Sequence, residues 1–239
     1  MYDLLVQNGS IVDGTGSTAY LADVAVVDGE IVAIGKLAGD ATQIVDAAGM
    51  VVSPGFIDLH THSDLSFLLD PTAQSKIRQG VTFELAGNCG GSYGAPLEGD
   101  AIESLKNRLS ASPHNLDVNW TDFGGYLDNI QNVGTTLNLA VQVGHGTIRS
   151  CVLGMESRPP DRDEMSKMKG LISESISSGA MGFSTGLFYA PGSYARLEEV
   201  IELASVAAEH GIIYSTHMRD EGTQNTGLMV AVSEAIEVG

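Results

Sequence analysis

Two histidines one residue apart, His60 and His62, end a short apolar run that starts at Phe56. Residues i and i+2 of a strand point to the same side, so both imidazoles can reach one ion. Neutral histidine is a standard zinc ligand, with a metal–nitrogen distance of about 2.0–2.1 Å. The pair taken by itself is more typical of two polar histidines at the start of a loop. Its position directly after an apolar strand-like segment favours a metal site.

Cys89 is a second candidate, and it lies among the glycines of residues 87–91. A thiolate can bind a metal or act as a nucleophile where its surroundings lower the pKa of the thiol. By residue type alone, a free cysteine is more often a small buried hydrophobe. Cys151 has no ligand-like neighbours, so we expect it to be such a small buried hydrophobe.

His217 ends another apolar run, so it repeats the strand-end position of the first histidines. Arg219 and Glu221 follow it and can either orient it through hydrogen bonds or pair with each other at the surface, where an ion pair contributes little. His145 lies between two glycines. It can polarise a substrate oxygen or bond to the backbone, and both roles stay open.

The segments that carry these residues alternate between strand-like apolar runs and helical patterns. The predicted strands are residues 56–60, 82–86, 137–143, 181–184 and 212–217, and the clearest predicted helices are 161–178, 196–209 and about 226–238. Such alternation is typical of a parallel sheet with helices packed outside it. In a (β/α) barrel the carboxyl ends of the strands form the active-site face. The candidate ligands fall at these strand ends.

The first 53 residues have a different pattern, with short β-rich segments at 4–7, 24–27, 31–34 and 43–45. Asn8-Gly9, Asp13-Gly14, Asp28-Gly29 and Ala48-Gly49 separate them, and such pairs tolerate the positive φ of tight turns. We expect a small β-structure here, with a hairpin at Asp28-Gly29.

The composition excludes several classes of partner. The chain has 239 residues, 12 Lys+Arg and 30 Asp+Glu, and a formal net charge of −18. Nucleic acids and anionic membranes attract basic clusters, so neither is expected as a partner. Two cysteines make no disulfide framework, and the first residues lack a signal-peptide pattern. No apolar run approaches the ~18 residues that span a bilayer. We therefore expect a cytoplasmic protein.

Six segments in order along the chain resemble the amidohydrolase superfamily and, within it, the N-acyl-D-amino-acid deacylases (D-aminoacylases). The run Pro-Gly-Phe-Ile-Asp-Leu-His-Thr-His is specific to the superfamily, and Gly-Asn-Cys is specific to the deacylase branch. The related hydantoinases and dihydroorotases usually place a carboxylated lysine where Cys89 stands. The six segments are residues 8–14, 51–64, 87–90, 143–146, 182–192 and 216–222.

The resemblance implies an α/β fold with an incomplete TIM-type (β/α) barrel, about five of eight strands, preceded by a small N-terminal β-subdomain. Residues 1–53 would form that subdomain, as part of a composite β-sandwich built from both chain ends. Residues 54–239 would form the partial barrel.

The resemblance also implies roles for single residues. His60 and His62 match the ligands of one metal subsite, Cys89 matches a thiolate that can bridge to a second subsite, and His217 matches a ligand of that second subsite. One or two zinc ions are expected. Tyr189 matches a tyrosine that binds the substrate carboxylate. Asn88 and His145 lie in matching motifs and are placed with Tyr189 among the substrate-binding residues.

The implied reaction is zinc-dependent hydrolysis of the amide bond of a small N-acyl-D-amino acid, giving a carboxylate and a free D-amino acid. In the family, the acid/base Asp and a further metal-binding His come from later strands, beyond Gly239. The chain therefore corresponds to the N-terminal part of the enzyme, and a missing C-terminal half is expected to complete the barrel. Two alternatives stay open: a cyclic-amide hydrolase of the hydantoinase or dihydroorotase type, and a truncated, catalytically silent metal-binding fragment.

Overall fold

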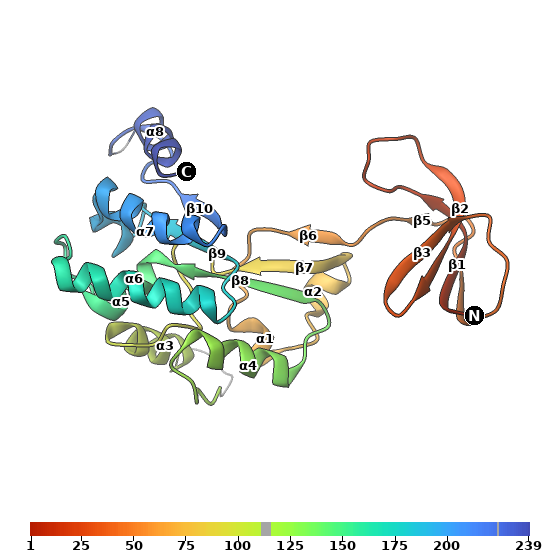
Figure 1. The fold of residues 1–239 in the computed structure, drawn as a ribbon, viewed down its shortest axis with the longest axis horizontal. Helices are drawn as coiled ribbons and strands as arrows, with labels where there is room; N and C mark the ends of the chain where they lie inside the picture. Colours follow the sequence, from red (N-terminus) through yellow and green to blue (C-terminus); the bar gives the residue numbers. More distant parts are fainter. Residues whose placement is uncertain (111–115, 224) are drawn as a thin grey trace. The chain divides into compact units, whose positions relative to one another are not determined.

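The computed structural model describes residues 1–110, 116–223 and 225–239. The chain divides into two compact units, Met1–Phe56 and Ile57–Gly239. Figure 1 shows the strands of the first unit in red and orange, and the strands and helices of the second unit in orange through yellow and green to blue.

The first unit is a five-stranded sheet. Its strands are β1 (Tyr2–Ile11), β2 (Tyr20–Val27), β3 (Glu30–Gly35), β4 (Ala41–Asp46) and β5 (Val51–Val52), in the order β3-β2-β1-β4 with β5 also paired to β1. The hairpin at Asp28-Gly29 is confirmed, because both residues have positive φ, 51° and 79°, between the antiparallel strands β2 and β3. The turn expected at Asn8-Gly9 is wrong. Asn8 has a φ of 62°, but it lies inside β1, where the register shifts, so its tolerance of positive φ serves a bulge.

The second unit is built on a curled sheet of five strands in the order β10-β9-β8-β7-β6. The strands are β6 (Phe56–Asp58), β7 (Val81–Ala86), β8 (Asn138–Gly144), β9 (Gly182–Gly186) and β10 (Ile213–His217). The pairs β7–β8, β8–β9 and β9–β10 are parallel. The predicted fold class, an incomplete TIM-type barrel after a small β-sheet, is confirmed.

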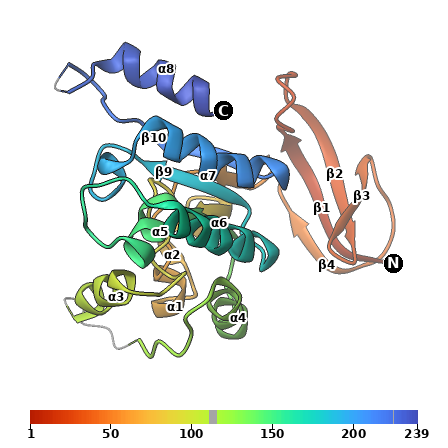
Figure 2. The ribbon, with the colours of Figure 1, turned by 60° about the vertical axis from the view of Figure 1, so that its left-hand side comes forward.

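Helices connect these strands. They are α1 (Ser66–Leu69), α2 (Gln74–Ile77), α3 (Asp100–Ser110), α4 (Phe123–Val133), α5 (His145–Val152), α6 (Arg162–Ser177), the 3-10 turn η1 (Gly192–Tyr194), α7 (Leu197–Glu209) and α8 (Leu228–Val238). Helix α6 packs against both α5 and α7, and Figure 2 shows these three side by side. The three predicted helices are present with ends shifted by at most two residues.

Local sequence explains where α6 begins. The Asp161 side chain accepts hydrogen bonds from the backbone N–H groups of Asp163 and Glu164, and the Glu164 carboxylate accepts one from the Asp161 N–H. This reciprocal capping box satisfies N–H groups that a helix start leaves without intrahelical partners. Arg158 holds the pKa of Glu164 down, at about 2, so the carboxylate that the box needs stays ionised.

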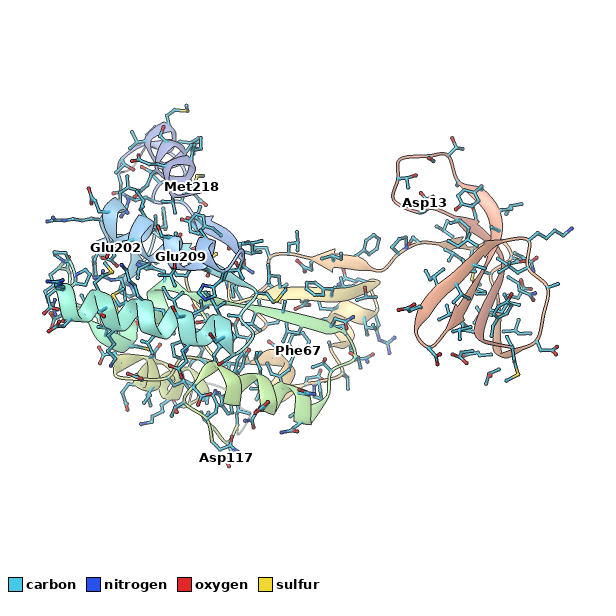
Figure 3. All side chains as sticks on the ribbon, in the orientation of Figure 1. Asp13, Phe67, Asp117, Glu202, Glu209 and Met218 are labelled. Carbon is cyan, nitrogen blue, oxygen red and sulfur yellow. The ribbon has the colours of Figure 1, made fainter. Side chains whose placement is uncertain are left out.

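The core of the second unit lies between the sheet and the helices, where Val143, Met168, Phe183 and Leu203 are fully buried. Phe67 is buried in this unit, whereas the acidic residues Asp117, Glu202 and Glu209 are exposed; Figure 3 labels all four. The excess of acidic residues is therefore carried in part by an exposed surface. Among the described residues, no helix combines the length and the apolar character needed to cross a membrane.

Candidate metal centre

The carboxyl ends of three strands bring four candidate ligands together. His60 and His62 follow β6, Cys89 follows β7, and His217 is the last residue of β10. The Cys89 Sγ lies 3.4 Å from His60 Nε2 and 3.6 Å from His217 Nδ1. One ligand atom from each of His60, His62 and Cys89 lies within 4.8 Å of the other two. Cys89 thus stands between the histidines of β6 and the histidine of β10.

These separations fit a shared metal ion. With metal–sulfur and metal–nitrogen distances of about 2.3 and 2.0–2.1 Å, a tetrahedral zinc site places its sulfur and nitrogen ligands about 3.5 Å apart. The two distances from Cys89 match that value. Thiolate and imidazole are also the ligand types that zinc prefers. The donor set of the chain therefore fits zinc.

The backbone around Cys89 allows this placement. Cys89 has a φ of 55°, and a Cβ on Gly186 would lie 2.0 Å from the Cys89 carbonyl oxygen, so only glycine lets β9 approach this loop. The Ser184 hydroxyl donates to the Gly87 carbonyl and accepts from the Gly90 N–H at 3.1 Å. Ser184 and Gly186 of β9 therefore fix the loop that presents the thiol.

His217 has partners on both ring nitrogens. Its Nδ1, which faces Cys89, is also in contact with the Tyr189 hydroxyl. Its Nε2 lies 3.0 Å from a carboxylate oxygen of Glu221. Such a carboxylate commonly fixes the orientation of a ligating imidazole. Arg219 pairs with Glu234, so of the two roles open for these residues, Glu221 orients His217 and does not pair with Arg219.

The electrostatics of the ligands follow from their partial burial. Desolvation raises the pKa of the Cys89 thiol and lowers the pKa of His62, where the charge of His60 adds to the effect. A neutral His62 is the form that binds a metal, whereas Cys89 must lose its proton when it binds one. Burial also raises the pKa of Asp64 to about 6.

Asn88 is placed next to Cys89 but is fully enclosed by protein. Its amide donates to the carbonyl oxygens of Leu85, at 2.8 Å, and Thr61, at 3.2 Å, and accepts from Gln142 at 2.9 Å. These bonds tie the loops after β6 and β7 to β8. In this arrangement the side chain supports the ligand loops and offers no group to the cavity.

His145 is also fully buried, at the start of α5. Its Nε2 lies 2.9 Å from the Glu199 carboxylate, which Arg149 binds at 2.7 Å. Desolvation alone would raise the pKa of Glu199, but His145 and Arg149 together hold it below its usual range. The structure thus pairs His145 with a buried carboxylate.

Gln142, Arg149 and Glu199 belong to these networks and escaped the sequence analysis. Gln142 is a polar residue inside the apolar run of β8, which is a signal that could have pointed to a buried hydrogen-bond network. Glu199 falls in the first turn of α7, where acidic residues are ordinary because they complement the helix dipole, so nothing marked it.

A cavity of about 550 Å³ opens beside the ligands. Its lining includes Cys89, Tyr189 and residues of α3 and of the start of α5. Tyr189 is 43% exposed, so its hydroxyl can meet a molecule in this space. The cavity has the size of a small-ligand site.

Comparisons with known proteins agree with this geometry. The sequence profile described as amidohydrolase family matches residues 43–224. D-aminoacylase of Alcaligenes xylosoxydans xylosoxydans is 38% identical over 239 residues, which are 100% of this chain and 48% of that protein. The chain thus spans about half the length of the curated relatives it matches.

Several solved structures match over the whole chain, among them two that bear on the metal centre. One is a D-aminoacylase described by its binuclear metal centre, with a TM-score of 0.88, 35% identity and coverage of 100% of this chain and 49% of that chain. The other is N-acyl-D-glutamate deacylase from Bordetella bronchiseptica in complex with zinc and a phosphonate inhibitor, with a TM-score of 0.86, 35% identity and the same coverage. The family profile covers most of the chain, and the chain therefore belongs to the amidohydrolase family and is similar over its whole length to the D-aminoacylases.

Proposed function

We propose that the protein hydrolyses the amide bond of N-acyl-D-amino acids, giving a carboxylate and a free D-amino acid, and that it does so at a zinc centre. The observation that carries the proposal is the position of Cys89, whose sulfur lies 3.4 and 3.6 Å from nitrogens of His60 and His217. A thiolate between two histidine groups at strand ends fits a centre of one or two ions.

In this proposal His60 and His62 hold one ion, Cys89 is shared, and His217 belongs to the second position. The binuclear centre of one similar protein and the zinc of another support this distribution. When bound, zinc would supply a Lewis acid that polarises a carbonyl oxygen and lowers the pKa of a bound water. Glu221 holds the His217 ring in the orientation that directs Nδ1 toward Cys89.

Tyr189 is proposed to bind the α-carboxylate of the substrate, since its hydroxyl lies at the border of the cavity and next to His217. Asn88 and His145 act differently from the sequence-based expectation in this proposal. Both are buried and bonded to protein groups, so they position the ligand loops and α5 and do not touch the substrate.

The net reaction also requires a general acid/base group that moves a proton to the leaving nitrogen. The acyl carbon gains the oxygen of a water, the carbon–nitrogen bond breaks, and the leaving nitrogen gains a proton. We place the general acid/base Asp that moves this proton beyond Gly239, because the chain spans about half the length of its relatives. Residues 54–239 would then be part of a complete barrel, and residues 1–53 part of a composite β-sandwich.

A substrate panel tests this function in the complete protein, including any sequence that adjoins these 239 residues. With zinc added, it is expected to release D-methionine from N-acetyl-D-methionine or D-glutamate from N-acetyl-D-glutamate, and to leave the L-enantiomers intact. The same assay with the isolated 239-residue chain separates an active chain from a silent metal-binding fragment. Turnover of a hydantoin without any N-acyl-D-amino acid would refute the proposal and favour a cyclic-amide hydrolase.

A further inference from the structure

A positively charged side chain, that of Arg108, lines the cavity beside the proposed metal centre. Arg108, near the end of α3, lines the same space as Cys89 and Tyr189. Its guanidinium carbon lies 3.7 Å from the centre of the Tyr93 ring. Across residues 1–110, 116–223 and 225–239 the Arg108 side chain has no hydrogen bond or ion pair.

The pattern of α3 places this cation on the face of the helix that borders the cavity. Ala101 and Leu105 are buried, and Ser104 and Arg108 follow them at the i, i+3, i+4, i+7 spacing of one helix face. All four residues line the cavity. Leu109 continues the apolar stripe of α3, and Arg108 lies beside it with an exposed side chain that borders the cavity.

Tyr93 forms a fixed platform for the guanidinium. Its backbone N–H donates to the Asp64 carboxylate at 3.3 Å, and a Cβ on Gly91 would lie 2.8 Å from the ring, so glycine makes room for it. An arginine stacked on an aromatic ring is held by its planar face. The N–H groups at its edge remain free to bind a carboxylate in the bidentate way.

The two carboxylates in the cavity wall do not serve as that partner. Glu103 is bonded to Lys106 at 2.7 Å, on the exposed side of the helix. Asp100 lies eight residues before Arg108 in the same helix, which is about 12 Å along its axis. Asp64 feels the charge of Arg108, but its carboxylate is buried and accepts from a backbone N–H, and no hydrogen bond or ion pair joins it to Arg108. Among the described residues, the guanidinium thus keeps donors that a ligand entering the cavity can use.

We propose that Arg108 selects substrates that carry a second carboxylate, besides the α-carboxylate assigned to Tyr189. This specificity rests on the proposed hydrolysis of N-acyl-D-amino acids. The second carboxylate can stand on the side chain of the D-amino acid or at the end of the acyl group, and the same guanidinium recognises both.

The test compares Arg108→Met, Arg108→Lys and the control Lys106→Met in the complete zinc-loaded protein. Lys106 is on the same helix and carries the same charge, but it does not line the cavity. The substrates are N-acetyl-D-glutamate, N-succinyl-D-methionine and N-acetyl-D-methionine. The measured quantity is the ratio of kcat/KM for each substrate with two carboxylates to kcat/KM for N-acetyl-D-methionine.

One of the two ratios is expected to fall at least about tenfold in Arg108→Met, as the loss of a hydrogen bond between charged groups predicts. It should recover in part in Arg108→Lys and keep the wild-type value in Lys106→Met. A fall for N-acetyl-D-glutamate places the second carboxylate on the amino-acid side chain, and a fall for N-succinyl-D-methionine places it on the acyl group. Unchanged ratios for both overturn the assignment of Arg108.

Binding separates this inference from the proposed function. If the wild type hydrolyses none of the three compounds, the proposed function fails. Calorimetry of the same compounds with chelator-treated protein then still decides the role of Arg108. Tighter binding of a compound with two carboxylates that is lost in Arg108→Met supports the inference, and equal affinities of wild type and variant contradict it.

Discussion

At the scale of single residues, the site depends on Cys89, whose thiol connects the histidines of β6 and β10. The two histidines that precede it in the chain could be predicted from their spacing, because two strand residues at i and i+2 face one side. The proximity of Cys89 and His217 could not, since 128 residues separate them. Their positions at strand ends placed both residues on one face of the predicted barrel, and the resemblance to a family assigned them to one site.

Cys89→Ala is expected to remove a metal ligand without disturbing the core. Zinc affinity should fall by more than the ~10–100-fold that is typical when a hydrogen-bond partner of a ligand is lost. Competition with a chromophoric chelator measures this change. Cys151→Ala is the matched control, because Cys151 is a buried free cysteine whose sulfur contacts the Pro96 carbonyl. Equal zinc affinities of the two variants would refute the assignment of Cys89.

Glu199 is the second residue whose role can be measured directly. Glu199→Gln leaves Arg149 buried without its charged partner, which typically costs about 3–5 kcal/mol. Urea unfolding of the complete protein at pH 7 measures this loss. Glu202→Gln, in the same helix, removes an exposed ion pair with Lys169 and should cost at most about 1 kcal/mol.

The lowered pKa of Glu199 also predicts how the stability difference between the wild type and Glu199→Gln depends on pH. A carboxyl whose folded-state pKa lies below its unfolded value of about 4.3 stabilises the fold above that pH, and the contribution is lost as the pH falls through the folded pKa. The difference in stability between wild type and Glu199→Gln should therefore be largest above pH ~5 and shrink in more acidic solution. A difference that grows on acidification contradicts the ion pair.

At the scale of elements, the strands and three helices could be predicted from apolar periodicity and from capping residues such as Asp161. The short helix α5 could not, because it begins at His145 between two glycines, which is typical of a loop. The turn expected at Asn8-Gly9 was wrong for a related reason, since positive φ is compatible with a turn and with a bulge alike. Local sequence reports what the backbone tolerates, and pairing with distant strands decides how it is used.

Close contact between β9 and the Cys89 loop gives a prediction for Gly186→Ala. The new Cβ would lie 2.0 Å from the Cys89 carbonyl oxygen. Because the backbone fixes the position of a Cβ and the oxygen is itself a backbone atom, no rotamer change relieves the overlap. We expect a loss of about 1–3 kcal/mol in the free energy of unfolding, together with lower zinc affinity. Denaturant unfolding and a zinc titration measure the two effects.

Gly170→Ala is the control for this substitution. Gly170 lies within α6, and a Cβ there meets nothing within 4 Å. Replacing glycine inside a helix should stabilise the protein by about 0.5–1 kcal/mol and leave zinc affinity unchanged. If Gly186→Ala behaves like Gly170→Ala, the tight packing of β9 against the Cys89 loop is not required.

At the scale of the whole molecule, the curled five-stranded sheet brings four candidate ligand residues together beside a cavity. The chain is a member of the amidohydrolase family, and it covers about half the length of its relatives. The candidate ligands lie at the carboxyl ends of the strands, which form the active-site face of a (β/α) barrel. The family and the half-barrel were predictable because the motifs stand in order along the chain, whereas the buried Asn88 and His145 networks depend on contacts between distant segments.

The most direct test of the central claim is the rate of D-amino acid release by the complete protein as zinc is returned to a chelator-treated sample. N-acetyl-D-methionine and N-acetyl-D-glutamate serve as substrates. We predict no release without metal, and a rate that rises with added zinc and reaches a plateau when the site is filled. Full activity without metal, or a zinc-loaded protein that hydrolyses neither compound, would contradict the account.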